Sequence, residues 1–237
     1  MEETQQPDVT VLVPALNEED TISEVLNRVL ALPLRLQVIV IDDGSDDATP
    51  TILKEFGDQI EVITNPQRSG KGMAIREGLE IARGEVVVIQ DADLEYAPED
   101  LTKLVQPIRD GSTNVVYGTR FLHGLPPSMK LPNKIVNVLL RWSVSVLFWR
   151  RISDEATCYK AFRRTVLQRM HLECTSFEFC PEVTAKAFRL GERILELPIR
   201  YEARSYAAGK KIRWTDAPIA FWTLLKHRFS QAWRRHS

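Results

Sequence analysis

Cysteine is scarce in this chain of 237 residues. The three cysteines, Cys158, Cys174 and Cys180, are unevenly spaced, and no two of them form a CxxC pair. This pattern argues against a disulfide-stapled fold and against a zinc site, and it favours a reducing compartment. The four histidines are scattered without ligand spacing, and no Ser-His-Asp order is found, so we assign the histidines no role.

Long hydrophobic runs are also absent. No segment reaches the ~18–20 uninterrupted apolar residues that span a bilayer. The polar and acidic start, MEETQQPD, is unlike a signal peptide or a transit peptide. We therefore expect a cytoplasmic protein, and the 44% of hydrophobic residues is enough for a sizeable core.

The common glycine-rich phosphate loops are missing as well. In NPQRSGKGMAIREG (65–78), Asn65 stands where a P-loop requires its first glycine, and Gly72 follows Lys71 in place of Ser or Thr. The dinucleotide pattern GxGxxG is not found either. The stretch therefore reads as a loop before an amphipathic helix, although Lys71 remains a candidate for contact with a phosphate.

Charge is divided unevenly along the chain. Residues 1–120 hold 10 Lys and Arg against 23 Asp and Glu, whereas residues 121–237 hold 21 against 9. The basic second half is expected to meet something anionic, such as a phosphate-bearing substrate or a membrane surface. We expect no nucleic-acid partner.

Short apolar runs alternate with amphipathic stretches in the first half. Repeated β-α-β units with short connections predict an α/β fold with a mostly parallel sheet covered on both faces. The predicted strands are 9–15, 36–42, 59–64, 85–91 and 113–119, with another at 193–201. Amphipathic helices are predicted in the second half at 133–149, 179–191 and 214–237.

Carboxylates gather where these strands end, which is where ligands bind in such sheets. Asp91, Asp93 and Glu95 alternate directly after the run 85–91. Oxygen ligands of this kind suit Mg²⁺ or Mn²⁺, which complete their coordination with substrate phosphates. The alternative is an acidic helix start, because LEYAPED leads into a predicted helix.

A second acidic pair, Asp42 and Asp43, ends the run 36–42 and can accept hydrogen bonds from a nucleoside base or ribose. Asp46 or Ser45 is expected to cap the next helix, and this interpretation accounts for Ser45, Asp46 and Asp47. Cations follow later in the chain. They are Arg120 after a strand end, and Arg204, Lys210 and Lys211 in YEARSYAAGKKIRW, which could clamp a diphosphate or form a solvated surface.

In their order along the chain, seven stretches resemble the family-2 glycosyltransferases of GT-A fold, in particular the dolichyl- and polyprenyl-phosphate sugar transferases. They are VLVPALNEE, VIDDGSDD, SGKGMAIREG, VVVIQDADLEY, VVYGTRF, DEATCYKAFRR and the segment from FEFCPEV to KKIRWTDA. The resemblance covers nearly the whole chain. It implies one Rossmann-like domain over 1–237, with 1–120 as the nucleotide-sugar half and 121–237 as an acceptor half that has amphipathic helices and a basic extension.

The resemblance also implies roles for individual residues. The implied nucleotide-sugar contacts are Pro14, Glu18, Asp42, Asp43, Lys71, Asp91, Arg204, Lys210 and Lys211. The implied metal ligands are Asp91, Asp93 and Glu95, with Glu95 where the branch often has Gln. The implied catalytic set is Asp91, Asp93, Arg120 and Asp154. Two positions depart from the pattern, since Leu16 replaces an aromatic and Asn133 replaces an arginine, for which Lys134 is a substitute.

The implied reaction is inverting transfer from a UDP- or GDP-linked sugar to a polyprenyl or dolichyl phosphate, aided by Mg²⁺ or Mn²⁺. A lipid phosphate is largely dianionic at pH 7, because its second pKa is ~6, so it needs no strong general base. A soluble sugar or glycan acceptor is the alternative, and it would require a base such as Glu155, Glu178 or Glu182. A non-catalytic nucleotide-sugar-binding module is the third possibility.

Members acting on lipid phosphates often carry transmembrane segments. Here we expect peripheral attachment to a membrane through the helix 133–149 and the tail 221–237, which combines aromatic residues with Lys and Arg. The alternative is that both helices simply pack on the domain. The sequence leaves open whether the chain forms a homo-oligomer.

Overall fold

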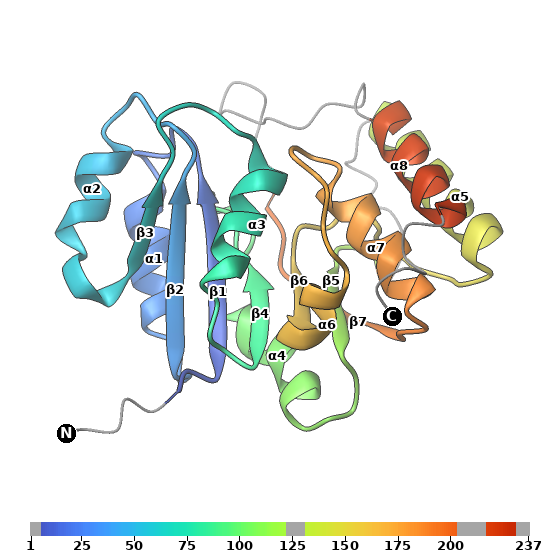
Figure 1. Cartoon of the computed structure of the whole chain (residues 1–237), viewed down its shortest axis with the longest axis horizontal. Coiled ribbons are helices and arrows are strands. Elements are labelled where there is room, and N and C mark those ends of the chain that lie inside the picture. The colour runs from blue at the N-terminus through green and yellow to red at the C-terminus, as the bar shows by residue number, and fades with distance from the viewer. Residues whose placement is uncertain (1–5, 122–130, 203–216, 231–237) are drawn as a thin grey trace.

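The computed structural model describes residues 6–121, 131–202 and 217–230. A seven-stranded sheet crosses the molecule and has helices on both faces (Figure 1). The strands are β1 (Val9–Ala15), β2 (Leu36–Asp42), β3 (Glu61–Thr64), β4 (Val86–Ile89), β5 (Val115–Thr119), β6 (Lys160–Arg163) and β7 (Ile194–Pro198). The helices are α1 (Ile22–Leu30), α2 (Thr49–Glu55), the short 3₁₀ helix η1 (Gly57–Gln59), α3 (Lys71–Glu80), α4 (Asp100–Arg109), α5 (Leu131–Phe148), α6 (Arg164–Arg169), α7 (Phe179–Arg189) and α8 (Ala217–Phe229).

The strand order is β3-β2-β1-β4-β6-β5-β7, and β6 alone runs antiparallel to its neighbours β4 and β5. The predicted mostly parallel sheet flanked by helices is confirmed, and all six predicted strands are present within a few residues of their predicted bounds. The strand β6 and the short helix α6 were not predicted. Their sequence, KAFRRTVLQR, is too short and too basic to show either the helical or the strand pattern of apolar residues.

The core has two layers, one on each face of the sheet. Apolar residues of α1, α2 and α4 pack on one face, and those of α3, α5, α6, α7 and α8 pack on the other. Within β4, Val86 and Val88 face the first layer while Val87 and Ile89 face the second. Because both faces are covered, the strands read as continuous apolar runs without alternation.

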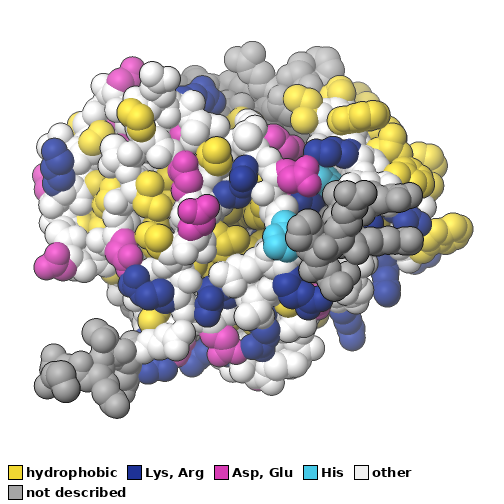
Figure 2. Space-filling view, viewed as in Figure 1, with side chains coloured by type: hydrophobic (Ala, Val, Ile, Leu, Met, Phe, Trp, Pro, Cys, Tyr) yellow, Lys and Arg dark blue, Asp and Glu magenta, His cyan; other side chains and the backbone are white. Residues whose placement is uncertain are grey.

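Helices α5 and α8 pack against each other at one end of the molecule. They leave an unusual number of large apolar side chains exposed, and Figure 2 shows hydrophobic side chains gathered on the right side, where Figure 1 places these helices. The exposed side chains are Leu131, Ile135, Val138, Leu139, Trp142 and Val146 of α5, with Ile219, Phe221, Trp222 and Phe229 of α8. We call this set the α5–α8 face. No helix in the described ranges is both long enough and apolar enough to cross a membrane.

Candidate active site

A cavity of about 340 Å³ opens beyond the carboxyl ends of β1, β2 and β4 and extends to α5 and α8. Its volume lies within the usual range of small-molecule sites, roughly 300–1,000 Å³. Eight of the residues selected from the sequence line it, namely Pro14, Glu18, Asp43, Lys71, Asp91, Asp93, Glu95 and Arg120. Strand ends that are far apart in sequence thus meet at one site, as the parallel topology requires.

The carboxylate of Asp43 anchors the loop that precedes α3. One of its oxygens accepts hydrogen bonds from the Ser69 backbone N–H at 2.7 Å and the Ser69 hydroxyl at 2.6 Å, and the other accepts from the Gly70 N–H at 2.8 Å. Burial alone would raise the pKa of Asp43, but these hydrogen bonds hold it below its ordinary value. Asp43 is therefore an ionised group on the cavity wall that also shapes the loop leading to Lys71.

Asp42 does not reach the cavity. It is almost fully buried, and its carboxylate accepts a hydrogen bond from the Ser45 backbone N–H at 3.1 Å. The geometry therefore gives Asp42 a role in the turn after β2 and brings only Asp43 of the predicted pair to the site. This outcome follows from strand alternation, which points successive side chains to opposite faces.

The turns after β1 and β2 are joined through Asn17, which adopts a φ of +52° that asparagine tolerates well. The Asn17 side chain and Asp46 exchange hydrogen bonds, and the Asn17 backbone N–H donates to the Ser45 hydroxyl at 2.9 Å. The predicted helix-capping role is therefore wrong for Ser45 and Asp46, because both side chains hold the Asn17 turn. Asp47 does contact the helix start, since its carboxylate accepts a hydrogen bond from the Thr49 N–H at 2.8 Å. This contact fixes the segment that carries Glu18 against the end of β2.

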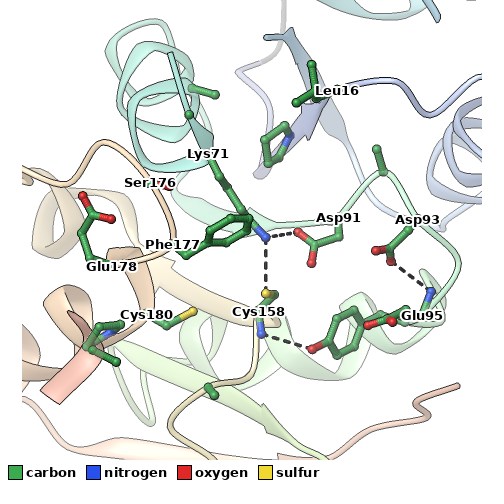
Figure 3. A pocket seen from close by; sticks show the side chains of 18 of the residues that line it. Leu16, Lys71, Asp91, Asp93, Glu95, Cys158, Ser176, Phe177, Glu178 and Cys180 are labelled. Carbon is green, nitrogen blue, oxygen red and sulfur yellow. Dashed lines mark hydrogen bonds and ion pairs between the residues drawn. The ribbon is translucent and has the colours of Figure 1, made fainter. Parts of the chain in front are cut away.

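Asp91, Asp93 and Glu95 all line the same cavity (Figure 3). The helix α4 begins only at Asp100, so an acidic helix start does not account for them. The Glu95 backbone N–H donates to an Asp93 carboxylate oxygen at 3.0 Å, which folds the segment into a tight turn. Carboxylates are the ligands that Mg²⁺ and Mn²⁺ prefer, so the chemistry of these three side chains suits such an ion. Their ligand atoms do not lie within 4.8 Å of one another in this structure, so all three could reach one ion only if their side chains turned toward it.

Asp91 is already paired with a cation of the protein itself. The Lys71 ammonium forms an ion pair with the Asp91 carboxylate and lies 3.3 Å from the Cys158 sulfur (Figure 3). The Lys71 and Asp91 side chains are only 17% and 15% exposed. Burial would lower the pKa of Lys71, but the charge of Asp91 outweighs it and the pKa is raised, so Lys71 is a fixed positive charge.

Arg120 is held by a two-pronged ion pair with Asp154. Its Nε and one terminal nitrogen each lie 2.7 Å from an Asp154 oxygen, and its backbone N–H donates to the same carboxylate at 3.0 Å. The guanidinium also lies against the rings of Phe121 and Tyr201, with centroids 4.8 Å and 5.0 Å away. Asp154 is wholly buried and does not line the cavity, so it acts by orienting Arg120.

The three carboxylates named as bases for a soluble acceptor differ sharply in environment. Glu182 lies outside the cavity, where it accepts two backbone N–H bonds and pairs with Lys186. Glu178 lines the cavity, and hydrogen bonds from Thr175 and the helix start lower its pKa against the effect of burial. Glu155 also lines it, but both of its carboxylate oxygens are buried without a partner.

Two cysteines that the sequence left without a role also line the cavity (Figure 3). The Cys158 thiol, together with the charges of Lys160 and Lys71, lowers the pKa of Cys180, although burial opposes this. The Cys180 thiol also donates to the Thr157 carbonyl oxygen at 3.4 Å. No spacing in the sequence could have brought these thiols together, because Cys158 precedes β6 and Cys180 lies in α7. The predicted basic residues Arg204, Lys210 and Lys211 lie outside the described residues.

Residues 10–170 match the model of the family described as Glycosyl transferase family 2. The chain belongs to this family. It is 32% identical over 204 residues to the low-salt glycan biosynthesis hexosyltransferase Agl6 of Haloferax volcanii, which covers 84% of this chain and 48% of that protein. It is 30% identical over 213 residues to an undecaprenyl-phosphate 4-deoxy-4-formamido-L-arabinose transferase of Pseudomonas fluorescens, covering 85% and 59%. A polyprenol monophosphomannose synthase of Mycolicibacterium smegmatis is 27% identical over 231 residues, covering 90% and 85%.

The chain thus spans about half of the first of these relatives and three fifths of the second. Among solved structures, glucosyl-3-phosphoglycerate synthase from Mycobacterium tuberculosis in complex with UDP matches with a TM-score of 0.73 and 22% identity, over 94% of this chain and 80% of that one. The mannosyltransferase PcManGT from Pyrobaculum calidifontis, in complex with GDP-Man and Mn²⁺, matches with a TM-score of 0.63 and 26% identity, over 98% and 65%. The fold is GT-A.

Proposed function

We propose that the chain is an inverting, metal-dependent glycosyltransferase that moves a sugar from a UDP- or GDP-linked donor to a polyprenyl phosphate. The observation that carries this proposal is a single cavity with two unlike ends. Carboxylates of the β1, β2 and β4 ends line one end, and apolar residues of α5 and α8 line the other. Curated relatives whose names specify undecaprenyl-phosphate and polyprenol monophosphomannose chemistry support it.

The donor occupies the acidic end in this proposal. Residues 1–120 form the nucleotide-sugar half, in which Pro14, Glu18 and Asp43 contact the nucleoside. Asp91, Asp93 and Glu95 would hold Mg²⁺ or Mn²⁺, which would neutralise the charge that grows on the leaving diphosphate. Lys71 can then turn from Asp91 toward a diphosphate oxygen, because Asp91 is the only carboxylate that its ammonium contacts among the residues that the structure describes.

The acceptor phosphate lies beside Arg120 in this proposal, within the half formed by residues 121–237. The Asp154 carboxylate accepts hydrogen bonds from Nε and one terminal nitrogen of Arg120, which fixes the plane of the guanidinium. The remaining N–H groups therefore point in a set direction. A phosphate dianion attacks the anomeric carbon directly and needs no residue to remove a proton. The basic residues Arg204, Lys210 and Lys211 would add positive charge, and their contribution is part of the proposal.

The α5–α8 face supports peripheral contact with a lipid surface, which would bring a long prenyl chain to the apolar end of the cavity. Trp142 and Trp222 are 63% and 64% exposed, and aromatic residues of this kind favour the membrane interface. Flotation of the full chain with vesicles containing anionic lipid tests this contact. We expect binding that a Trp142→Ser, Trp222→Ser double variant weakens by about tenfold, whereas Val62→Ser, an exposed apolar position on β3, leaves binding unchanged. Absence of vesicle binding by the unaltered chain would overturn the contact.

Transfer itself is tested in two steps. UDP, GDP and their common sugar conjugates are screened for thermal stabilisation of the full chain with Mn²⁺, and the stabilising donor is then offered citronellyl phosphate. We expect a glycosyl phosphate product whose formation stops with EDTA and falls by at least ~100-fold in Asp93→Asn. Transfer to citronellol or a free sugar in preference to the phosphate would favour the soluble-acceptor alternative. Binding without turnover would favour a binding module.

A further inference from the structure

Glu155 is the unexplained group in the cavity. The residue is 2% exposed, and among the residues that the structure describes its two oxygens are the only buried carboxylate oxygens without a hydrogen-bond partner. Leaving a buried polar group unpaired usually costs ~1–3 kcal/mol, so such a group calls for an explanation. Because Glu155 also lines the cavity, a ligand can supply the missing partner.

The backbone around Glu155 is held on both sides by hydrogen bonds. On one side, the Asp154 backbone N–H donates to the Glu196 carboxylate at 3.1 Å. On the other, the fully buried Lys160 ammonium donates to the carbonyl oxygens of Glu155 and Thr157 at 2.8 Å and 2.6 Å. These three contacts fix the backbone that carries the Glu155 side chain.

Several titratable groups act on Glu155. They are Asp154 on the same loop, Tyr117 on β5, Lys160 on β6 and Cys180 on α7. The Thr184 hydroxyl on α7 also lies near enough to lower the pKa of Glu155, although it makes no hydrogen bond of ordinary geometry with the carboxyl group. Burial is the largest influence and raises the pKa of Glu155 to about 8, although the charge of Lys160 opposes it. At pH 7 the carboxyl group is therefore mostly protonated and carries an O–H that can donate a hydrogen bond.

The neighbours of Glu155 define the chemistry of its partner. Arg120, held by the adjacent Asp154, lines the same cavity and favours an anion. The wall beyond is apolar, with Val136 and Leu140 of α5 and Ile219 of α8. A ligand that fits has an anionic hydrogen-bond acceptor at one end and an apolar chain at the other, as a prenyl monophosphate has.

We propose that the Glu155 carboxyl group donates a hydrogen bond to a non-bridging oxygen of the acceptor phosphate and thereby selects a phosphate over a hydroxyl acceptor. This inference rests on the proposed function. A charge-assisted O–H···O⁻ bond is among the stronger hydrogen bonds. A hydroxyl acceptor needs the opposite, an ionised carboxylate that removes its proton, and at pH 7 that form of Glu155 is the minor one.

Glu155→Gln separates these two roles, because an amide still donates a hydrogen bond but cannot act as a base. Binding of citronellyl phosphate to the full chain is measured by calorimetry, without donor, at pH 7.0 and 9.5. At pH 7.0 we expect Glu155→Gln to bind within about threefold of the unaltered chain and Glu155→Ala to bind about tenfold more weakly. Glu80→Gln, an exposed position on α3, serves as the matched control and should bind as the unaltered chain does.

The pH dependence gives an independent readout. A phosphate monoester stays dianionic above its second pKa of ~6, so only the protein changes charge across this range. The unaltered chain should lose affinity by up to about tenfold for each pH unit above 8, and Glu155→Gln should lose none. Equal affinity in Glu155→Ala and the unaltered chain at pH 7.0, or an equal pH response in Glu155→Gln, would overturn the proposal.

Different results would contradict the proposed function and the proposed role of Glu155. If no nucleotide stabilises the chain and no transfer occurs, the proposed function fails, and the binding of citronellyl phosphate still tests Glu155. If a hydroxyl acceptor is glycosylated and Glu155→Gln abolishes that reaction while nucleotide binding persists, glycosyl transfer stands and Glu155 is a base, which overturns the present assignment. Thermal melting of each variant shows whether it is folded, and the isosteric Gln variant covers the case in which Ala destabilises the chain.

Discussion

The ion pair between Lys71 and Asp91 makes a sharp prediction about metal binding. A cation that coordinates Asp91 must first displace the Lys71 ammonium, which contacts that carboxylate directly. An exposed ion pair contributes ~0.2–1 kcal/mol, and breaking a buried pair costs ~3–5 kcal/mol. With side chains 17% and 15% exposed, this pair falls between those limits, at about 2 kcal/mol.

The perturbation is Lys71→Met, which keeps the length of the side chain and removes its charge. Without nucleotide, Mn²⁺ should bind about 10- to 30-fold more tightly to the variant, because ~1.4 kcal/mol corresponds to a factor of ten. With Mn²⁺ present, UDP or GDP should bind about tenfold more weakly, because the diphosphate loses a cation. Opposite changes in the two affinities are the signature of a lysine that moves between Asp91 and the donor.

Mn²⁺ binding is measured by electron paramagnetic resonance of the free ion, and nucleotide binding by calorimetry at saturating Mn²⁺. Lys103→Met is the matched control. The Lys103 ammonium on α4 lies 3.2 Å from an Asp100 carboxylate oxygen, and neither residue lines the cavity. This variant should leave both affinities unchanged. Unchanged or weaker Mn²⁺ binding by a folded Lys71→Met variant would refute the reasoning.

Three further predictions concern stability, each measured by urea denaturation. Glu155→Gln should remove a pH dependence. The pKa of Glu155 in the folded state, about 8, exceeds its ordinary value of 4.5, so the unaltered chain should lose stability relative to the variant as pH rises from about 4.5 to 8, and a constant difference would contradict this. Asp154→Asn should lower the free energy of unfolding by about 3 kcal/mol, because it leaves the Arg120 charge buried and unpaired. Glu24→Gln, which removes one of the two exposed partners of Arg28, should change it by less than ~0.5 kcal/mol. Gly70→Ala should lower the free energy of unfolding by at least ~2 kcal/mol, because φ is +97° and a Cβ would lie 2.3 Å from the Thr175 carbonyl oxygen. Gly57→Ala, where φ is +50° and a Cβ would meet open space, should lower it by about 1 kcal/mol. Equal losses at the two glycines would show that the contact with Thr175 is unimportant.

The sheet was predictable because its strands are buried on both faces and therefore stand out as Val- and Ile-rich runs. The strand β6 was not, because four residues carry no period and its place between β4 and β5 depends on contacts distant in sequence. Its first residue, Lys160, is a fully buried charge that sequence alone would place on the surface.

The candidate site was predictable to the extent that it depends on topology. Strand ends bring Asp43, Asp91 and Arg120 to one cavity whatever the details of packing. The sequence could not show which of two adjacent aspartates faces the cavity, because that depends on the register of one residue in β2. Nor could it show that Lys71 reaches Asp91 or that Glu155 is left without a partner, because both depend on side-chain placement across separate elements.

The reversed strand β6 has a consequence for how such a site can change. Parallel strands present their last residues to the cavity, whereas β6 presents its first, so the segment 152–159 arrives at the same rim from the opposite chain direction. The cavity wall is therefore built from two kinds of segment: turns that follow parallel strands, and the segment that precedes β6. Exchanging the short segment that leads into β6 would alter the groups around Arg120 while leaving the turns after β1, β2 and β4 intact. In the proposed function, one architecture could thus acquire a new acceptor by replacing a few residues and keep its donor.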